Sequence, residues 1–269
     1  MKKRPFTVTE YRVKATQPSR MGRGAAPIRA ALISDTHGRS IPGLVEAVAE
    51  ASPDLILVPG DAIENKRPGH HEGIPLLSAL ASVAPLFFSS GNHERELSAE
   101  QLRGLEHAGV HRVDLHTEQL EVRGECIRIG GVPSASYENG ELCQTTLSGL
   151  LFPPKALSVL PERTAEYIRR FAREDGVKLL LCHHPEYYER YLRNQNTGIV
   201  CSGHAHGGQI RLLGHGLYAP GQGFLPRYTS GVHDGRFVIS RGLTNHSFPP
   251  RIFNRPELVI LNIYLNTDR

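Results

Sequence analysis

Five hydrophobic stretches of this chain each end abruptly in a short turn that carries aspartate, asparagine or histidine. They have the length and composition of buried strands: Ile28 to Ser34, Asp54 to Val58, Ala84 to Ser89, Val177 to Leu181 and Ile199 to Cys201. The turns that follow them are DTHG, PGD, GNHE, CHHP and GHAH. In open α/β sheets, ligand sites lie beyond the carboxyl ends of the strands. We therefore expect the five turns to converge on one site.

The segments around these stretches predict helices, a hairpin and further short strands. Helices are expected at Pro42 to Glu50, Gly73 to Val83 and Arg163 to Glu174. Glu118 to Arg123 and Cys126 to Ile129 flank Gly124-Glu125 and predict a hairpin, and Arg236 to Ser240 and Leu258 to Leu265 predict strands. The sequence has no repeat, linker or low-complexity segment. We expect one domain over residues 1–269, with its core motifs in residues 28–210.

The bulk composition is that of a soluble globular protein. Hydrophobic residues make up 39% and charged residues 22%, and no apolar run approaches the roughly 18 residues that cross a bilayer. The net charge of +4 suits anionic substrates but is too small to indicate nucleic acid. Basic residues gather before residue 27, which indicates a solvated leader and strand or a weak contact with anionic lipid. These features predict a cytoplasmic protein, with peripheral membrane contact as the alternative.

The four cysteines contain no CxxC pair and predict reduced, buried thiols: Cys126, Cys143, Cys182 and Cys201. Cys182 and Cys201 each stand close to a motif histidine. Alternation along a strand would point them away from it, so packing is the expected role.

Each polar turn has an ordinary explanation when it is taken alone. Asp35 or Asp61 could cap a helix, and Asn92 could fill a turn position with positive φ. His204 and His206 could share a strand face by chance. The ordered combination DxH, GD, GNHE, H-x-P and GHAH is much harder to explain by chance.

This ordered set resembles the calcineurin-like metallophosphoesterases, from Ser34-Asp35-Thr36-His37 to Gly203-His204-Ala205-His206. SGHAHGGQIRL and RGLTN…PPRIFNRPEL resemble one bacterial branch, which includes membrane-associated phosphoesterases and UDP-2,3-diacylglucosamine pyrophosphatases. The resemblance implies a four-layer αββα sandwich, in which two mixed β-sheets pack together between outer helices. Buried strands that alternate with amphipathic helices agree with such layers.

The resemblance also implies the roles of single residues. Asp35, His37 and His206 would hold one metal ion; Asn92, His183 and His204 would hold a second; Asp61 would bridge both. His93 would contact the phosphate and protonate the leaving oxygen, with Glu94 orienting it. Asn92 would also contact substrate, and Arg39, which follows the DTHG turn, is a weaker candidate for binding a phosphate oxygen.

The residue types agree with these implied roles. Mixed His, Asp and Asn ligands suit manganese, iron or zinc better than calcium or magnesium. Two divalent ions could share a hydroxide that attacks phosphorus. Two aspartates and one hydroxide would offset three of the four metal charges, which leaves a positive site for phosphate.

The substrate would be a phosphorylated small molecule or a nucleotide-sugar or lipid-linked phosphoester. A nuclease or cyclic-nucleotide phosphodiesterase could use the same site, although a nuclease would favour a basic groove. A non-catalytic binding protein on the same fold would not need every ligand and His93. A metalloprotease is disfavoured because HExxH is absent. The apolar segment 147–157 fits no expected element and could pack on the core or meet a hydrophobic substrate.

Overall fold

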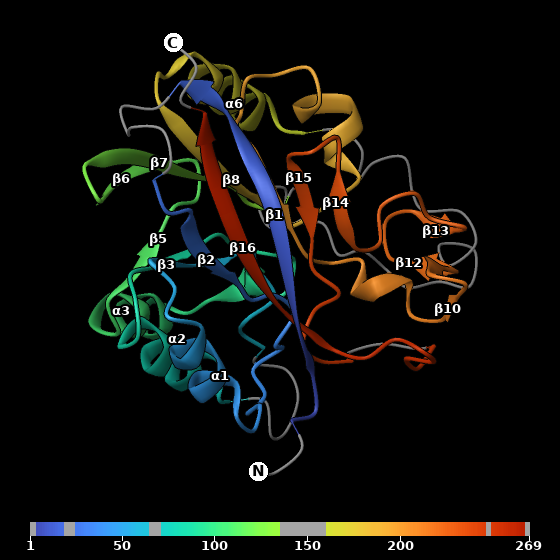
Figure 1. The fold of residues 1–269 in the computed structure, drawn as a ribbon. Helices are drawn as coiled ribbons and strands as arrows, with labels where there is room; N and C mark the ends of the chain where they lie inside the picture. Colours follow the sequence, from blue (N-terminus) through green and yellow to red (C-terminus); the bar gives the residue numbers. More distant parts are fainter. Residues whose placement is uncertain (1–3, 19–24, 65–70, 135–159, 246–248, 267–269) are drawn as a thin grey trace.

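Two six-stranded mixed sheets form the centre of the computed structural model, which describes residues 4–18, 25–64, 71–134, 160–245 and 249–266. In sheet order, the first contains β1 (Thr7–Pro18), β16 (Glu257–Asn266), β2 (Ile28–Leu32), β3 (Leu55–Val58), β4 (Leu86–Phe88) and β5 (Val110–Arg112). The second contains β14 (Gly231–His233), β15 (Phe237–Ile239), β9 (Ile199–Ser202), β8 (Val177–Cys182), β7 (Glu125–Val132) and β6 (Thr117–Val122). The long strands β1 and β16 run side by side and parallel (Figure 1).

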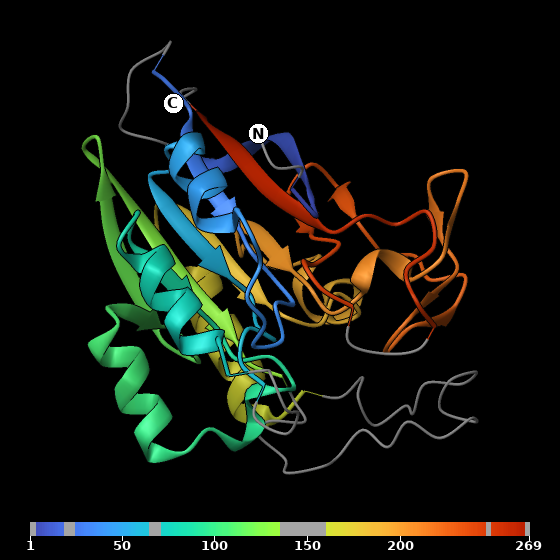
Figure 2. The same cartoon turned by 90° about the horizontal axis from the view of Figure 1, so that it is seen from below.

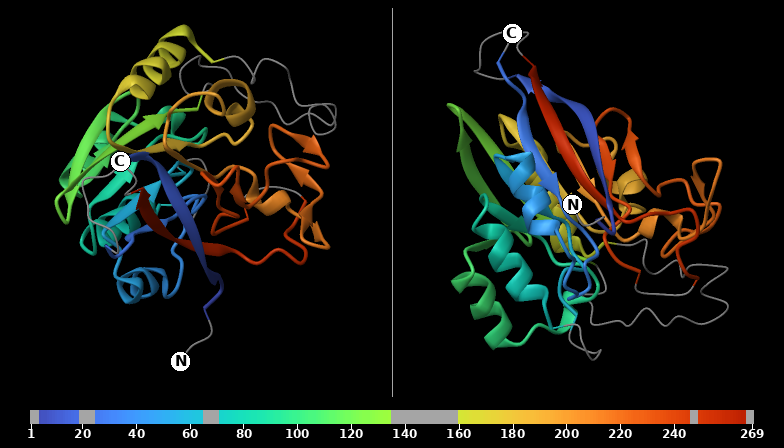
Figure 3. Two further views of the ribbon diagram at one scale, coloured as in Figure 1. Left: turned by 45° about the horizontal axis from the view of Figure 1, so that its top comes forward. Right: turned by 60° about the horizontal axis from the view of Figure 1, so that its bottom comes forward.

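Helices cover the outer faces of both sheets. α1 (Leu44–Ala51), α2 (Gly73–Ala81) and α3 (Ala99–His107) pack on the first sheet, and α6 (Glu162–Arg173) packs on the second. Figure 2 shows α2 and α3 on the outside of their sheet, and the left view of Figure 3 shows α1 and α6 on opposite sides of the pair of sheets. This arrangement confirms the predicted four-layer sandwich.

Alternation along the strands produces three separate cores. In β3, Leu55 and Leu57 face the other sheet, while Ile56 and Val58 face the helices. In β8, Leu179 faces the first sheet and joins the same inter-sheet core. Strands buried on both faces are expected to be continuously apolar, as these are.

Most of the predicted elements are present with ends shifted by one or two residues. The hairpin is confirmed, since β6 and β7 pair antiparallel from Thr117–Gly130 to Val122–Glu125. The elements that were not predicted include the helix α3 and the strand β5. The basic residues near the start of the chain were expected on a solvated leader and strand; in β1, Arg12 and Lys14 are exposed, while Val13 and Ala15 between and beside them are buried against the inter-sheet core.

The described cysteines are free thiols, and two of the three behave as predicted. Cys182 and Cys201 are buried in the cores, and burial raises the pKa of the Cys201 thiol to about 12. The prediction of burial is wrong for Cys126, which is half-buried on the hairpin. Cys143 and the apolar segment 147–157 lie outside the described residues. Among the described helices, none has the length and apolar character needed to span a bilayer.

The topology gathers strand ends from both sheets at one edge. β2, β3 and β4 are parallel neighbours in the first sheet, and β8 and β9 are parallel neighbours in the second. The turns after all five strands lie at a shared edge of the two sheets, since side chains from every one of them belong to groups whose polar atoms lie within 4.8 Å of one another. The sequence motifs occupy these turns.

Candidate metal centre

Two groups of three side chains, each with one carboxylate and two imidazoles, form at this shared edge. Asp35, His37 and His206 form the first group, and Asp61, His183 and His204 form the second. Within each group, the atoms able to bind a metal lie within 4.8 Å of one another. Asp61 also belongs to a third such group with His37 and His93, so it joins the two halves of the site.

The first group brings two ring nitrogens and a carboxylate together. Nδ1 of His206 lies 3.3 Å from the carbonyl oxygen of Thr244, which accepts, and 3.3 Å from Nη2 of Arg251, which donates. These two contacts favour opposite tautomers of a neutral ring. Nε2 of His206 lies 3.4 Å from Nε2 of His37 and 3.6 Å from Oδ1 of Asp35. Burial lowers the pKa of His206 and thus favours the neutral ring that a metal requires.

The second group also places electron-rich atoms close together, as a cation site does. Nδ1 of His183 donates to the carbonyl oxygen of Pro59 at 3.0 Å, so a neutral His183 has its lone pair on Nε2. Nε2 then faces Oδ2 of Asp61 at 3.1 Å, which brings two electron-rich atoms together. Burial lowers the pKa of His183, but Asp61 outweighs it and raises that pKa to about 9. Either a proton or a metal ion can satisfy this contact.

The remaining donors fit a metal as well. Burial lowers the pKa of His204 well below its usual range, and its neighbours His184 and His183 lower it further. Oδ1 of Asn92 is buried and accepts no hydrogen bond from the described residues, so it is an oxygen donor in need of a partner. The donor set of carboxylate, amide oxygen and neutral imidazole therefore fits transition-metal ions.

The ligand turns have an unusual backbone conformation. Five of the predicted ligands have positive φ: Asp35 at 56°, His37 at 47°, Asp61 at 52°, His204 at 64° and His206 at 46°. Asp and His tolerate this region better than most residues, but it still indicates local strain. Such strain is concentrated at functional sites, because the surrounding structure must impose it.

His93 lies beside both groups and is held by a carboxylate that sequence reasoning missed. Its Nδ1 lies 2.7 Å from Oε2 of Glu64, and its Nε2 lies 3.9 Å from Oδ2 of Asp61. Burial lowers the pKa of His93, but Asp61 and Glu64 outweigh it and raise that pKa to about 9. Glu64 stands three residues after Asp61 in Gly60-Asp61-Ala62-Ile63-Glu64, and a carboxylate so close to a ligand was the available signal.

The predicted contact from Glu94 to His93 is wrong in this structure. The Glu94 carboxylate is fully buried and accepts four backbone N–H groups, from Asp61, Ala62, Ile63 and Gly91, at 2.6–2.9 Å. Burial and Asp61 raise the pKa of Glu94 to about 7. Glu94 therefore holds the two turns that follow β3 and β4, and Glu64 holds the imidazole.

A segment near the end of the chain supports the His206 turn from behind. Asn254 Nδ2 donates to the carbonyl oxygens of His206 and Gln209 at 2.8 and 2.9 Å. The Arg251 guanidinium donates to the carbonyl oxygens of Thr244 and Arg241, both at 2.6 Å. The sequence marked this segment by its resemblance to a family branch without showing that it packs on the GHAH turn.

His184, which was predicted only as the neighbour of the ligand His183, forms side-chain contacts of its own. Its Nδ1 lies 3.0 Å from Oε1 of Glu186, and its Nε2 lies 2.7 Å from Oγ of Ser134. Its ring centroid lies 4.2 Å from that of His204. The Ser134–His184–Glu186 chain therefore supports one side of His204 as a hydrogen-bonded unit.

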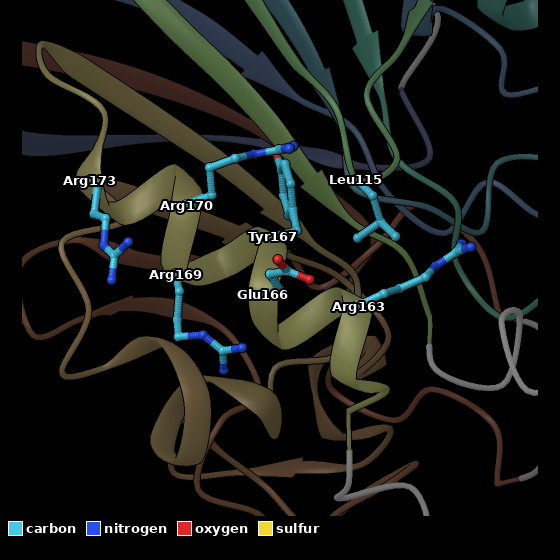
Figure 4. Close-up of a pocket in the computed structure, with 7 residues that line it drawn as sticks. All are labelled: Leu115, Arg163, Glu166, Tyr167, Arg169, Arg170 and Arg173. Atoms are coloured by element: carbon cyan, nitrogen blue, oxygen red, sulfur yellow. The ribbon is translucent and has the colours of Figure 1, made fainter.

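Arg39 lies partly exposed beside the Asp35–Gly38 turn, and its role in phosphate binding stays a prediction. An open groove of about 730 Å³ lies elsewhere, along the outer face of α6 (Figure 4). Four arginines line much of it, with Glu166, Tyr167 and Leu115. None of the clustered ligands lines this groove, so it is separate from the candidate metal centre.

The fold and the clustered ligands together define the chain as a metal-dependent phosphoesterase. The model of the calcineurin-like phosphoesterase family matches residues 28–208, which contain all seven predicted ligands. The chain belongs to the calcineurin-like phosphoesterase family and is a metal-dependent hydrolase of phosphoric esters.

Two curated relatives resemble the chain over most of its length. Phosphodiesterase YaeI of Escherichia coli (strain K12) is 26% identical over 269 residues, which cover 89% of this chain and 83% of YaeI. The uncharacterized protein YpbG of Bacillus subtilis (strain 168) is 26% identical over 250 residues, which cover 92% of this chain and 85% of YpbG.

Among solved structures, a 5'-nucleotidase precursor from Thermus thermophilus is similar with a TM-score of 0.52 and 15% identity. The match covers 80% of this chain and 49% of that protein, so the chain spans about half its length. At this identity the likeness shows the fold alone.

Proposed function

We propose that this chain hydrolyses a phosphodiester or pyrophosphate bond with two divalent transition-metal ions. The observation that carries the proposal is the pair of adjacent ligand groups, joined by Asp61, at the meeting edge of two sheets. Asp35, His37 and His206 would hold one ion, Asn92, His183 and His204 the other, and Asp61 both. When bound, manganese, iron or zinc ions would supply positive charge for the phosphate and a nucleophilic hydroxide at neutral pH.

A histidine of the chain would supply the proton that the leaving oxygen needs. Glu64 engages Nδ1 of His93, so the proton available for donation is the one on Nε2, which faces Asp61 and the ligand groups. Asp61 and Glu64 outweigh the effect of burial and raise the pKa of this imidazole to about 9, which favours the protonated ring. His93 therefore fits the role of general acid for the leaving oxygen.

A diester is favoured as the substrate class because the relative YaeI is named a phosphodiesterase. A nucleotide-sugar or lipid-linked pyrophosphate is likewise cleaved at a P–O bond by attack on phosphorus, and it extends the proposal to larger substrates.

The test combines metal analysis with hydrolysis by one preparation. Protein loaded with manganese, iron or zinc should contain close to two ions per chain and should cleave aryl phosphodiesters in preference to aryl monoesters. His93→Asn should keep the metal content and lower turnover by about 10²–10⁴-fold. Folded protein that takes up no metal would refute the proposal, and loss of metal in His93→Asn would show that His93 is a ligand.

A further inference from the structure

Three hydrogen-bonded side chains beside the second ligand group have no part in the proposed reaction, and we call them the His184 triad. Nδ1 of His184 lies 3.0 Å from Oε1 of Glu186, and Nε2 of His184 lies 2.7 Å from Oγ of Ser134. Ser134 and His184 are buried, and the Glu186 side chain is 13% exposed. β7 and β8 are parallel neighbours with Val132 opposite Cys182, and this register brings the residues that follow the two strands together.

Both ring nitrogens of His184 are occupied by protein partners. A carboxylate can only accept, so Nδ1 of a neutral His184 carries the proton and donates to Glu186. Nε2 then has the lone pair and accepts from the Ser134 hydroxyl. The ligand atoms of His184, Glu186 and His204 lie close enough together to hold an ion. However, His184 has no free lone pair for it, which favours a supporting role over metal binding.

The fold makes room for the Glu186 carboxylate at some cost. Gly221 has φ of 73°, and a β-carbon at this position would overlap Oε1 of Glu186. Oε2 of Glu186 is buried and has no hydrogen-bond partner in the part of the chain that the structure describes. A largely buried carboxylate that contacts one imidazole contributes little to stability, because removing its charge from water is costly. The contact with His184 is therefore better explained by function than by folding.

The His204 ring depends on its neighbours for its orientation. Metal-binding histidines usually donate their second ring N–H group to a carboxylate or a carbonyl oxygen, which fixes the ring. The His204 ring forms no such hydrogen bond with any described residue, although its backbone N–H donates to Asp35. It packs instead against the rings of His184 and His183, with centroid distances of 4.2 and 5.0 Å. The ring of His184, which is held at both nitrogens, is therefore the fixed surface against which His204 is oriented.

The first ligand group takes its support from a different segment. Nδ1 of His206 lies 3.3 Å from both the Thr244 carbonyl oxygen and Nη2 of Arg251. The Thr244 hydroxyl donates to the carbonyl oxygen of Asp35 at 2.8 Å, and Asn254 Nδ2 donates to that of His206 at 2.8 Å. These supporting residues lie near the end of the chain. The two ligand groups therefore have separate supports.

We propose that Ser134, His184 and Glu186 are positioning residues that orient His204 toward the second metal ion and set the affinity for that ion alone. The inference rests on the proposed function, in which His204 is a ligand of the second of two ions. Replacement of residues that support metal ligands typically lowers metal affinity by about 10–100-fold. Loss of the His184 triad should therefore weaken the second site by this factor and leave the first site unchanged.

Manganese titration of metal-free protein tests the inference in single-site backgrounds. His37→Ala should leave the second site and Asn92→Ala the first, so each background reports on one ion. Adding Glu186→Ala should weaken the site that remains in His37→Ala by about 10–100-fold and leave the site that remains in Asn92→Ala unchanged. Glu186→Gln keeps an oxygen that can accept from Nδ1 of His184, so it should restore most of the lost affinity.

The complete site provides a spectroscopic readout that fold stability alone would not change. At two equivalents of manganese the parent should give the EPR spectrum of two spin-coupled ions, and Glu186→Ala at the same free metal concentration should give that of an isolated ion. Ser134→Ala removes less of the His184 triad and should shift the spectrum in the same direction with less risk to folding. Melting in EDTA shows that each variant remains folded. His111→Gln is the matched control, because it breaks an imidazole–carboxylate contact of 2.7 Å outside the ligand groups and should leave both sites unchanged.

Three results would overturn the inference. Equal affinity of the parent and Glu186→Ala for both ions would show that the His184 triad does not act on the metal, and equal weakening of both ions would assign it to general stability. Three ions in the parent and two in Glu186→Ala would make the triad a metal site of its own. A folded parent that binds no metal would refute the proposed function, and this inference with it, before any variant is compared.

Discussion

Replacement of Glu94 by glutamine should destabilise the fold, whereas the same change at Glu64 should slow the reaction. Oε1 of Glu94 accepts from Ala62 N and Ile63 N, and Oε2 accepts from Asp61 N and Gly91 N. A glutamine keeps one oxygen, so two of these four buried N–H groups would face an NH₂ group. The two contacts that glutamine would lose are hydrogen bonds from a backbone N–H group to a charged acceptor.

The expected loss follows from these contacts. Hydrogen bonds to charged groups contribute about 1.5–3 kcal/mol each, so losing two costs about 3–6 kcal/mol. Burial and repulsion by Asp61, which raise the pKa of Glu94 to about 7, offset part of this because glutamine is neutral. A net loss of about 3 kcal/mol remains, which corresponds to a melting temperature lower by roughly 6–12 °C for a chain of this size.

The assay is urea unfolding followed by circular dichroism, since the chain has no tryptophan. EDTA should be present throughout, so that bound metal does not add to the stability of the folded state. Glu106→Gln, an exposed carboxylate in α3, is the matched control and should change stability by less than about 0.5 kcal/mol. Glu64→Gln should change stability little but lower turnover by about tenfold, because His93 would lose its carboxylate partner.

The two variants separate two assignments of the carboxylates. If Glu94→Gln keeps its stability and slows turnover as Glu64→Gln does, then Glu94 orients His93 as the family resemblance implied. The reasoning from the four backbone contacts would then be refuted.

Three further outcomes are expected. Asp61→Asn should lower metal occupancy at both sites and abolish hydrolysis, since Asp61 belongs to both halves of the centre; elemental analysis that finds two ions would contradict this. Lys178→Met should lower unfolding free energy by about 2–3 kcal/mol without changing metal content, because Nζ of Lys178 donates to the carbonyl oxygens of Phe171, Ala172 and Glu174 at the end of α6. Removal of metal by EDTA should lower the melting temperature reversibly, and an unchanged melting curve would argue against metal binding by the folded state.

Local patterns in the sequence were sufficient to predict where the strands end and which residues follow them. Apolar runs such as Leu55–Val58 define buried strands directly, and the polar turn after each run is visible in the sequence. The helix α3 was also predictable, since Ser98 and Gln101 have the spacing of a capping box and form one in the structure. That signal was missed because the helix has few apolar residues.

Long-range pairing could not be predicted from such patterns. β1 and β16 pair across almost the whole chain, from Thr7–Glu257 to Lys14–Tyr264, and no local feature specifies this partner. The division of the five motif strands between two sheets is equally invisible in the sequence. The partners of Lys178 could not be predicted for the same reason. The sequence places a lysine within a buried strand, and only the structure shows that the carbonyl oxygens at the end of α6 accept its hydrogen bonds.

The candidate metal centre owes its shape to backbone contacts between distant turns. Thr244 N and its hydroxyl donate to the carbonyl oxygen of Asp35 at 3.1 and 2.8 Å, and His37 N donates to that of Asp61 at 2.9 Å. Gly242, with φ of 71°, has no side chain in the way; a β-carbon there would lie 2.8 Å from Oδ2 of Asp35.

These contacts account for the positive φ of the ligand residues. Left-handed backbone costs a residue with a β-carbon roughly 1–2 kcal/mol, so five such residues need support from the surrounding fold. The bonds from Glu94 and Thr244 provide such support at the Asp61 and Asp35 turns. The positive charge of a bound metal would face Asp35, Asp61 and the neighbouring imidazoles.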